Sequence, residues 1–202
     1  MAARIDKAVV SGVFSLDGED FDVDNNVWLV GDDDEVLVID APHDAAPIVE
    51  AIGGRRVTAI VLTHGHNDHI TAAVALRQAT GAPIWFNPAD RMLWDVVHPD
   101  GAPDRKLAEG TTFEVAGATL VAVHTPGHSP GSTCLYAGDL GTVFTGDTLF
   151  CGGPGATGRS FSDHPTIVES IRTRLLTLPG DTVVRTGHGD DTTIAAETST
   201  VS

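Results

Sequence analysis

The run Thr63-His64-Gly65-His66-Asn67-Asp68-His69 decides how this chain is interpreted. It places four potential metal ligands within six residues: His64, His66, Asp68 and His69. Imidazole nitrogens and carboxylate oxygens suit borderline divalent cations such as zinc. The alternative is a solvated loop that merely contains histidines, and such dense spacing is not typical of one. The run therefore predicts a metal site.

The flanking sequence predicts that this run is a turn between two regular elements. Residues 57–62 are apolar and rich in β-branched side chains, which is typical of a buried strand. Residues 70–77 are rich in alanine and are followed by Gly81-Ala82-Pro83, so we expect a helix that stops there. Rigid elements on both sides would hold several ligands in register. The sequence thus predicts a preorganised site.

Three more candidate ligands follow apolar, strand-like segments later in the chain: His128, Asp147 and His188. Each lies beside glycine in a predicted loop, a place where functional side chains are common. Taken singly, each is also typical of an ordinary turn residue. Together with the first run they predict one metal-binding set.

The order and spacing of these motifs resemble the metallo-β-lactamase superfamily and, within it, the glyoxalase II-like (hydroxyacylglutathione hydrolase-like) hydrolases. The resemblance extends from Asn26 to Ile194. It implies an α/β fold, a four-layer αββα sandwich. The length of the chain and its 42% hydrophobic content predict that residues 1–202 form a single domain. The resemblance also implies two metal sites, one held by His64, His66 and His128, the other by Asp68, His69 and His188, with Asp147 bridging both. Asp40 would steer one of the ligands, although a strand-end turn is an equal alternative.

Two divalent ions, with zinc expected and iron or manganese as alternatives, would explain this ligand set. They can lower the pKa of a shared water from about 15.7 towards neutrality and stabilise the oxyanion formed when the hydroxide attacks an acyl carbon. A thiolate, with a free pKa near ~8.5, leaves without obligatory protonation. We therefore predict a metal-dependent hydrolase that cleaves a thioester, with Asp68 and Asp147 as the catalytic carboxylates.

Several other functions are compatible with the same motifs. The β-lactamases of the superfamily carry Cys or Ser where this chain has Asp147, which disfavours antibiotic hydrolysis, and 202 residues leave no room for the insertion of the nuclease branch. A mononuclear iron persulfide dioxygenase uses the same scaffold with two histidines and one aspartate. A lactonase or other ester hydrolase, and a binding protein without catalytic activity, are the further alternatives.

The substrate is less well indicated. Glyoxalase II enzymes carry a C-terminal helical domain that contacts glutathione, and its absence after His188 makes glutathione thioesters a weaker expectation. Arg159 could bind a substrate carboxylate in a bidentate manner, or could instead hold its own loop in place. Cys151 is expected to be a loop or pocket-wall residue, because no partnered base is evident beside it.

Composition limits the partners. The 12 basic and 28 acidic residues give a formal charge of −16, which disfavours nucleic acid and anionic membranes. We expect a small-molecule substrate. The chain has no apolar stretch near 18 residues, no hydrophobic N-terminal leader and only two cysteines, Cys134 and Cys151, so we expect a cytoplasmic location. The acidic stretches 17–24 and 32–34 are predicted to be solvated turns.

The remaining patterns predict the order of elements. They give a hairpin of residues 27–30 and 36–39, helices over 45–52 and 88–97, strands over 111–115, 118–124, 133–136 and 142–144, and a helix that opens at Ser162-Asp163-His164-Pro165 and ends at Pro179-Gly180.

Overall fold

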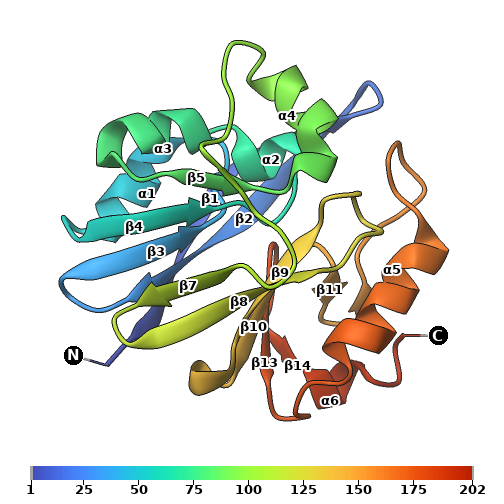
Figure 1. The fold of residues 1–202 in the computed structure, drawn as a ribbon. Coiled ribbons are helices and arrows are strands. Elements are labelled where there is room, and N and C mark those ends of the chain that lie inside the picture. Colours follow the sequence, from blue (N-terminus) through green and yellow to red (C-terminus); the bar gives the residue numbers. More distant parts are fainter. Residues whose placement is uncertain (1, 202) are drawn as a thin grey trace.

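The computed structural model describes residues 2–201 and contains two six-stranded sheets packed face to face, as Figure 1 shows. The first sheet consists of β1 (Arg4–Leu16), β2 (Glu19–Gly31), β3 (Glu35–Ile39), β4 (Arg56–Val61), β5 (Ile84–Phe86) and β6 (Arg105–Lys106), in that order. The second has the order β14 (Thr192–Thr193), β13 (Val183–Thr186), β10 (Thr142–Gly146), β9 (Thr133–Ala137), β8 (Ala118–His124) and β7 (Thr112–Val115). A small ribbon pairs β11 (Leu149–Phe150) with β12 (Gly153–Pro154).

Helices cover the outer face of each sheet (Figure 1). The helical segments are α1 (Ala45–Ile52), α2 (Asn67–Ile70), α3 (Ala73–Thr80), η1 (Pro88–Asp90), α4 (Arg91–Val97), η2 (Gly138–Leu140), α5 (His164–Ser170), η3 (Ile171–Leu175) and α6 (Ile194–Glu197). In Figure 1, α1 and α3 lie over the first sheet and α5 runs along the second. The order helix, sheet, sheet, helix is the predicted four-layer sandwich.

Side chains that alternate in direction along each strand explain the four layers. Val36 and Val38 of β3 pack in the apolar cluster shared with α1 and α3, whereas Leu37 and Ile39 pack in the cluster between the two sheets. Because successive side chains of a strand point to opposite faces, a continuous apolar run is needed where both faces are covered. A third cluster lies between the second sheet and α5 and includes Ile167. The three apolar clusters therefore separate four layers.

The prediction that residues 17–24 form solvated turns is wrong. Only Asp17 and Gly18 make the turn of a long hairpin, and β2 begins at Glu19 and pairs with β1 along its whole length. The acidic side chains here alternate with Phe21 and Val23. That period of two is the signature of a strand, and it outweighs the charge of the stretch. The hairpin extends along the edge of the first sheet past the end of β4.

The predicted helix over residues 70–77 is divided in the structure. Asn67–Ile70 forms α2, one turn follows, and α3 runs from Ala73 to Thr80. The helix predicted to open at Ser162-Asp163 does begin there, because the Asp163 carboxylate accepts a hydrogen bond from the Thr166 amide at 2.9 Å. Its last turns, η3, are π-helical, so the predicted apolar stripe continues through a wider helix.

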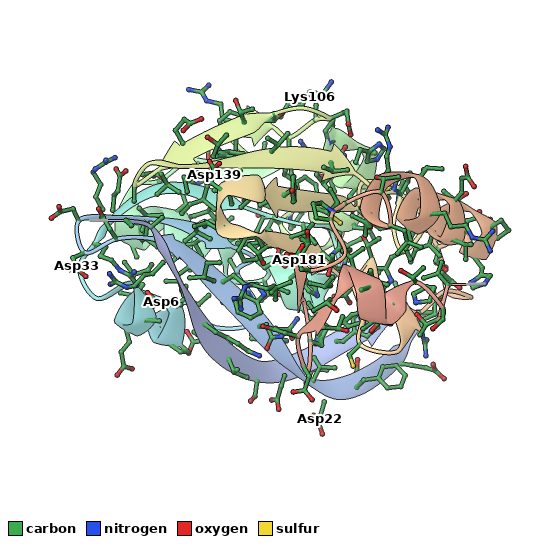
Figure 2. The ribbon with its side chains drawn as sticks, turned by 90° about the horizontal axis from the view of Figure 1, so that it is seen from below. Asp6, Asp22, Asp33, Lys106, Asp139 and Asp181 are labelled. Atoms are coloured by element: carbon green, nitrogen blue, oxygen red, sulfur yellow. The ribbon has the colours of Figure 1, made fainter. Side chains whose placement is uncertain are left out.

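The negative charge is spread over the surface. Figure 2, viewed from below Figure 1, shows Asp22 and Asp33 projecting outward at different edges of the first sheet and its loops. Within residues 2–201, no helix is both long and apolar enough to cross a bilayer.

Candidate metal centre

The candidate ligands come from loops at the ends of strands in both sheets. The run from His64 to His69 follows β4 of the first sheet, and Asp147 and His188 follow β10 and β13 of the second. Since β10 and β13 are parallel neighbours, their carboxyl ends lie at the same edge. His128 lies in the loop between β8 and β9. The topology therefore brings distant parts of the sequence to one place.

Three histidines form the first group. His64 Nε2 lies 3.1 Å from His66 Nδ1, which in turn lies 3.0 Å from His128 Nε2. All three side chains are buried. Three imidazole nitrogens pointing at a common centre are a typical metal-binding arrangement.

Asp68, His69 and His188 form the second group. His188 Nε2 lies 3.2 Å from both Asp68 Oδ2 and His69 Nε2, and the last two atoms are 3.5 Å apart. Asp147 lies between the groups, with Oδ1 3.3 Å from His69 Nε2 and Oδ2 3.5 Å from His128 Nε2. One carboxylate thus contacts residues of both groups.

The opposite ring nitrogens of four histidines are fixed by oxygen atoms. The Nδ1 atoms of His128 and His188 lie 2.9 Å and 2.8 Å from the carbonyl oxygens of Ala156 and Asp24. His69 Nδ1 lies 2.8 Å from Asp40 Oδ2 and His64 Nδ1 lies 3.1 Å from Thr63 Oγ1. A proton on each Nδ1 leaves Nε2 unprotonated and directed at the centre, as metal-binding histidines require.

The donor set fits metal ions by a second criterion. Two buried carboxylate oxygens of the cluster have no hydrogen-bond partner among the described residues: Asp68 Oδ1 and Asp147 Oδ1. Buried polar atoms without partners are rare, because leaving them unpaired is costly. Two carboxylates and five imidazoles with unused acceptor capacity match the ligands of borderline divalent cations.

The electrostatics of the metal-free cluster divide its histidines into two classes. Burial lowers the pKa of His66 to about 3. Burial also lowers the pKa of His188, but Asp147 and Asp68 outweigh it and raise this pKa to about 10. His69 has its pKa raised in the same way, against burial, by Asp147 and Asp68. The cluster therefore carries protons on its carboxylate side that a metal ion would displace.

Two residues of the centre were missed by the sequence analysis. The Asn25 Nδ2 atom lies 3.1 Å from Asp68 Oδ2 and 3.2 Å from His69 Nε2. Its Oδ1 atom lies 2.7 Å from Nε2 of His43, a histidine to which the sequence assigned no role. Asn25 and Asn26 are buried polar residues that directly precede the apolar run Val27–Val30 of β2, and that placement is the signal that could have found them.

A cavity of about 470 Å³ opens onto the cluster. Its other walls are largely apolar and include Phe14, Val23, Phe150 and Ala156. A smaller space of about 80 Å³, also lined by Phe14, His66 and His128, extends to Arg159. The centre is thus open to a small molecule on one side.

Arg159 is already engaged. Its Nη2 atom lies 2.7 Å from Glu19 Oε2, and its guanidinium lies 4.8 Å from the centre of the Phe21 ring. The amide of Ser160 donates to Asp17 Oδ2 at 3.0 Å. These contacts hold the β1–β2 hairpin against the loop of residues 156–162. Cys151 is exposed, and the only other cysteine, Cys134, is buried.

Comparison with known families and proteins gives one consistent match. The family described as the metallo-beta-lactamase superfamily matches residues 21–188. A hydroxyacylglutathione hydrolase, GloC of Haemophilus influenzae, is 35% identical over 85% of this chain and 89% of its own length. A hydroxyacylglutathione hydrolase of Cereibacter sphaeroides is 36% identical over 82% of this chain, which spans 62% of that relative.

Solved structures give the same fold. A B3 metallo-beta-lactamase, BLEG-1, has a TM-score of 0.78 and 28% identity, over 93% of this chain and 95% of that one. The di-iron-bound form of a protein named TTHA1623 has a TM-score of 0.75 and 31% identity, over 86% and 92%. ETHE1 from Myxococcus xanthus has a TM-score of 0.71 and 27% identity, over 92% and 80%.

Proposed function

Because the chain belongs to the metallo-beta-lactamase superfamily, we propose that it is a metal-dependent hydrolase acting on a thioester. The observation that carries the proposal is the position of Asp147 between two groups of ligands, within 3.5 Å of His128 and His69. A single ion would not use both groups. Similarity to two hydroxyacylglutathione hydrolases at about 35% identity supports the thioester as substrate class.

In this proposal His64, His66 and His128 would hold one divalent ion, Asp68, His69 and His188 would hold the other, and Asp147 would contribute to both sites. Such ions lower the pKa of water towards neutrality and polarise a carbonyl oxygen. The protein positions them through the fixed Nδ1 atoms of its histidines, of which His69 and His188 must give up their protons on loading.

Neither cysteine has the surroundings of an activated nucleophile. Burial raises the pKa of the Cys134 thiol to about 11, so it is not a thiolate at neutral pH. Cys151 is exposed on a loop. The apolar walls formed by Phe14, Val23 and Phe150 would instead exclude bulk water from a bound acyl group.

The proposal places Arg159 beside the substrate. It lines the smaller space next to His66 and His128, where its free donors could bind a carboxylate. Because one face of the guanidinium already contacts Phe21 and one nitrogen contacts Glu19, the side chain is also oriented in advance.

The test is hydrolysis of a panel of thioesters, led by S-lactoylglutathione, by protein of known metal content. We expect activity that follows occupancy by two ions, disappears on chelation and returns with zinc, and is abolished by His66→Ala. Activity on lactones or phosphodiesters, with none on thioesters, would reject the substrate class. Unchanged turnover in His66→Ala would remove the proposed metal centre from the chemistry.

A mononuclear iron dioxygenase acting on persulfides is the second candidate. A solved relative that is 31% identical supports iron as the metal, although that relative holds two iron ions and not one. Two groups of ligands favour two ions instead. Elemental analysis, together with oxygen consumption on glutathione persulfide, separates the two functions.

A further inference from the structure

Asp90 is a completely buried carboxylate at the junction of η1 and α4. Its Oδ2 atom accepts hydrogen bonds from the Gly65 amide at 2.8 Å and the Ser129 hydroxyl at 2.6 Å. Its Oδ1 atom accepts from the Gly131 amide at 2.5 Å. Both oxygens of one buried side chain are therefore used to hold loop atoms.

These donors belong to the two loops that supply the first group of histidines. Gly65 lies between His64 and His66, and Ser129 follows His128. Asp90 thus connects two segments that are about sixty residues apart in sequence, through hydrogen bonds that span 25 residues to Gly65 and 39 to Ser129. Within residues 2–201, Asp90 forms no hydrogen bond with Asp68 or His69.

Both loops approach Asp90 so closely that only glycine fits. A Cβ added at Gly65 would lie 2.9 Å from Asp90 Cβ, and one at Gly131 would lie 2.6 Å from Asp90 Cγ. Neither glycine has a positive φ. Space, rather than backbone conformation, therefore explains glycine at both positions.

We propose that Asp90 is a positioning residue for the metal site formed by His64, His66 and His128. By fixing Gly65 and Gly131, it sets the distance between the two loops and so the separation of the three imidazoles. Removing the carboxylate leaves two buried amides unpaired, which the loops must move to satisfy. The proposal rests on the metal centre of the proposed function, but not on its substrate.

The test measures zinc affinity in proteins that retain a single site. His188→Ala leaves the first group intact, and His66→Ala leaves the second. Adding Asp90→Ala should weaken zinc binding about 10–100-fold in the first background and less than about threefold in the second. Asn25→Ala is the matched control, because Asn25 contacts Asp68, His69 and His188 of the second group, and it should give the reverse pattern. Affinity is read by competition with a chromophoric chelator, without substrate.

An equal loss in both backgrounds, or no loss in the first, would overturn the proposal. Circular dichroism and thermal unfolding of the metal-free proteins check that each variant folds. If Asp90→Ala does not fold, Asp90→Asn and Ser129→Ala replace it, since the first keeps the volume and the second removes one of three donors. For these replacements too, zinc affinity must fall more in the His188→Ala background than in the His66→Ala background. Failure to cleave thioesters would reject the substrate class while leaving this result intact.

Discussion

Asp40 Oδ2 lies 2.8 Å from Nδ1 of His69, and both side chains are buried. Asp40 also accepts hydrogen bonds from the amide and hydroxyl of Thr63, at 2.7 Å and 2.9 Å. The carboxylate therefore fixes the ring of a candidate ligand and the start of the ligand loop together. Its backbone has a φ of 65°, which is uncommon for aspartate. The side chain has a positioning role that an ordinary turn would not need.

We predict that Asp40→Asn lowers the affinity for zinc about 10–100-fold, because an amide cannot accept hydrogen bonds at both atoms and orients His69 less firmly. Chelator competition measures the change. Asp139→Asn, at an exposed residue of η2, is the control and should bind zinc as the unaltered protein does. Equal affinities in all three proteins would show that Asp40 does not orient the ligand.

Asp147→Asn should reduce kcat/KM at least about 100-fold, as expected when a charged group that stabilises the transition state is removed. The neutral amide should also reduce the number of bound ions, because Asp147 contacts both groups. Elemental analysis and thioester assays on the same sample measure both effects. The exposed Asp181→Asn serves as the comparison. Two bound ions and full activity in Asp147→Asn would contradict the bridging role.

The metal-free protein should be most stable near pH 6.5, the ordinary pKa of histidine. His188 has a folded pKa of about 10, so its stabilising contribution is complete below pH 6.5 and is lost as pH rises to 10. His66 has a folded pKa of about 3, so the neutral side chain costs stability as pH falls below 6.5. Urea unfolding of chelator-treated protein between pH 4 and 10 measures the curve. His188→Gln should flatten its alkaline side, and a curve unchanged by that substitution would reject the assignment.

Arg159→Ala should raise KM for thioesters that carry a carboxylate and leave KM for uncharged thioesters nearly unchanged, if the side chain binds that carboxylate. Glu19→Gln is the matched variant, because it removes the ion pair with Arg159 but keeps the guanidinium. If Arg159 only holds the hairpin in place, Arg159→Ala will affect both kinds of thioester equally. Steady-state kinetics on the two substrates distinguishes these roles.

The order of elements and the candidate ligands could be predicted from the sequence because their signals are local. The apolar run before His64 and the glycines beside His128 and His188 are visible within a few residues. The β1–β2 hairpin was not predicted, since the acidic side chains of residues 19–24 obscured an alternation that includes Phe21.

Asn25 and Asp90 could not be identified in this way. Asn25 becomes part of the centre through Asp68, 43 residues away, and Asp90 through Gly65 and Gly131, 25 and 41 residues away. Near its own position Asp90 resembles any carboxylate at the start of a helix, where such residues are common. Only the tertiary fold shows that it is buried and which loops it joins.

The ligands are divided between the two sheets, with the run from His64 to His69 on one side and His128, Asp147 and His188 on the other. A peptide cut in the exposed connection at residues 102–104 would therefore yield two fragments, neither of which holds a full complement of donors. Zinc shared by the two fragments would therefore add to the apolar contacts between the sheets in holding the halves together.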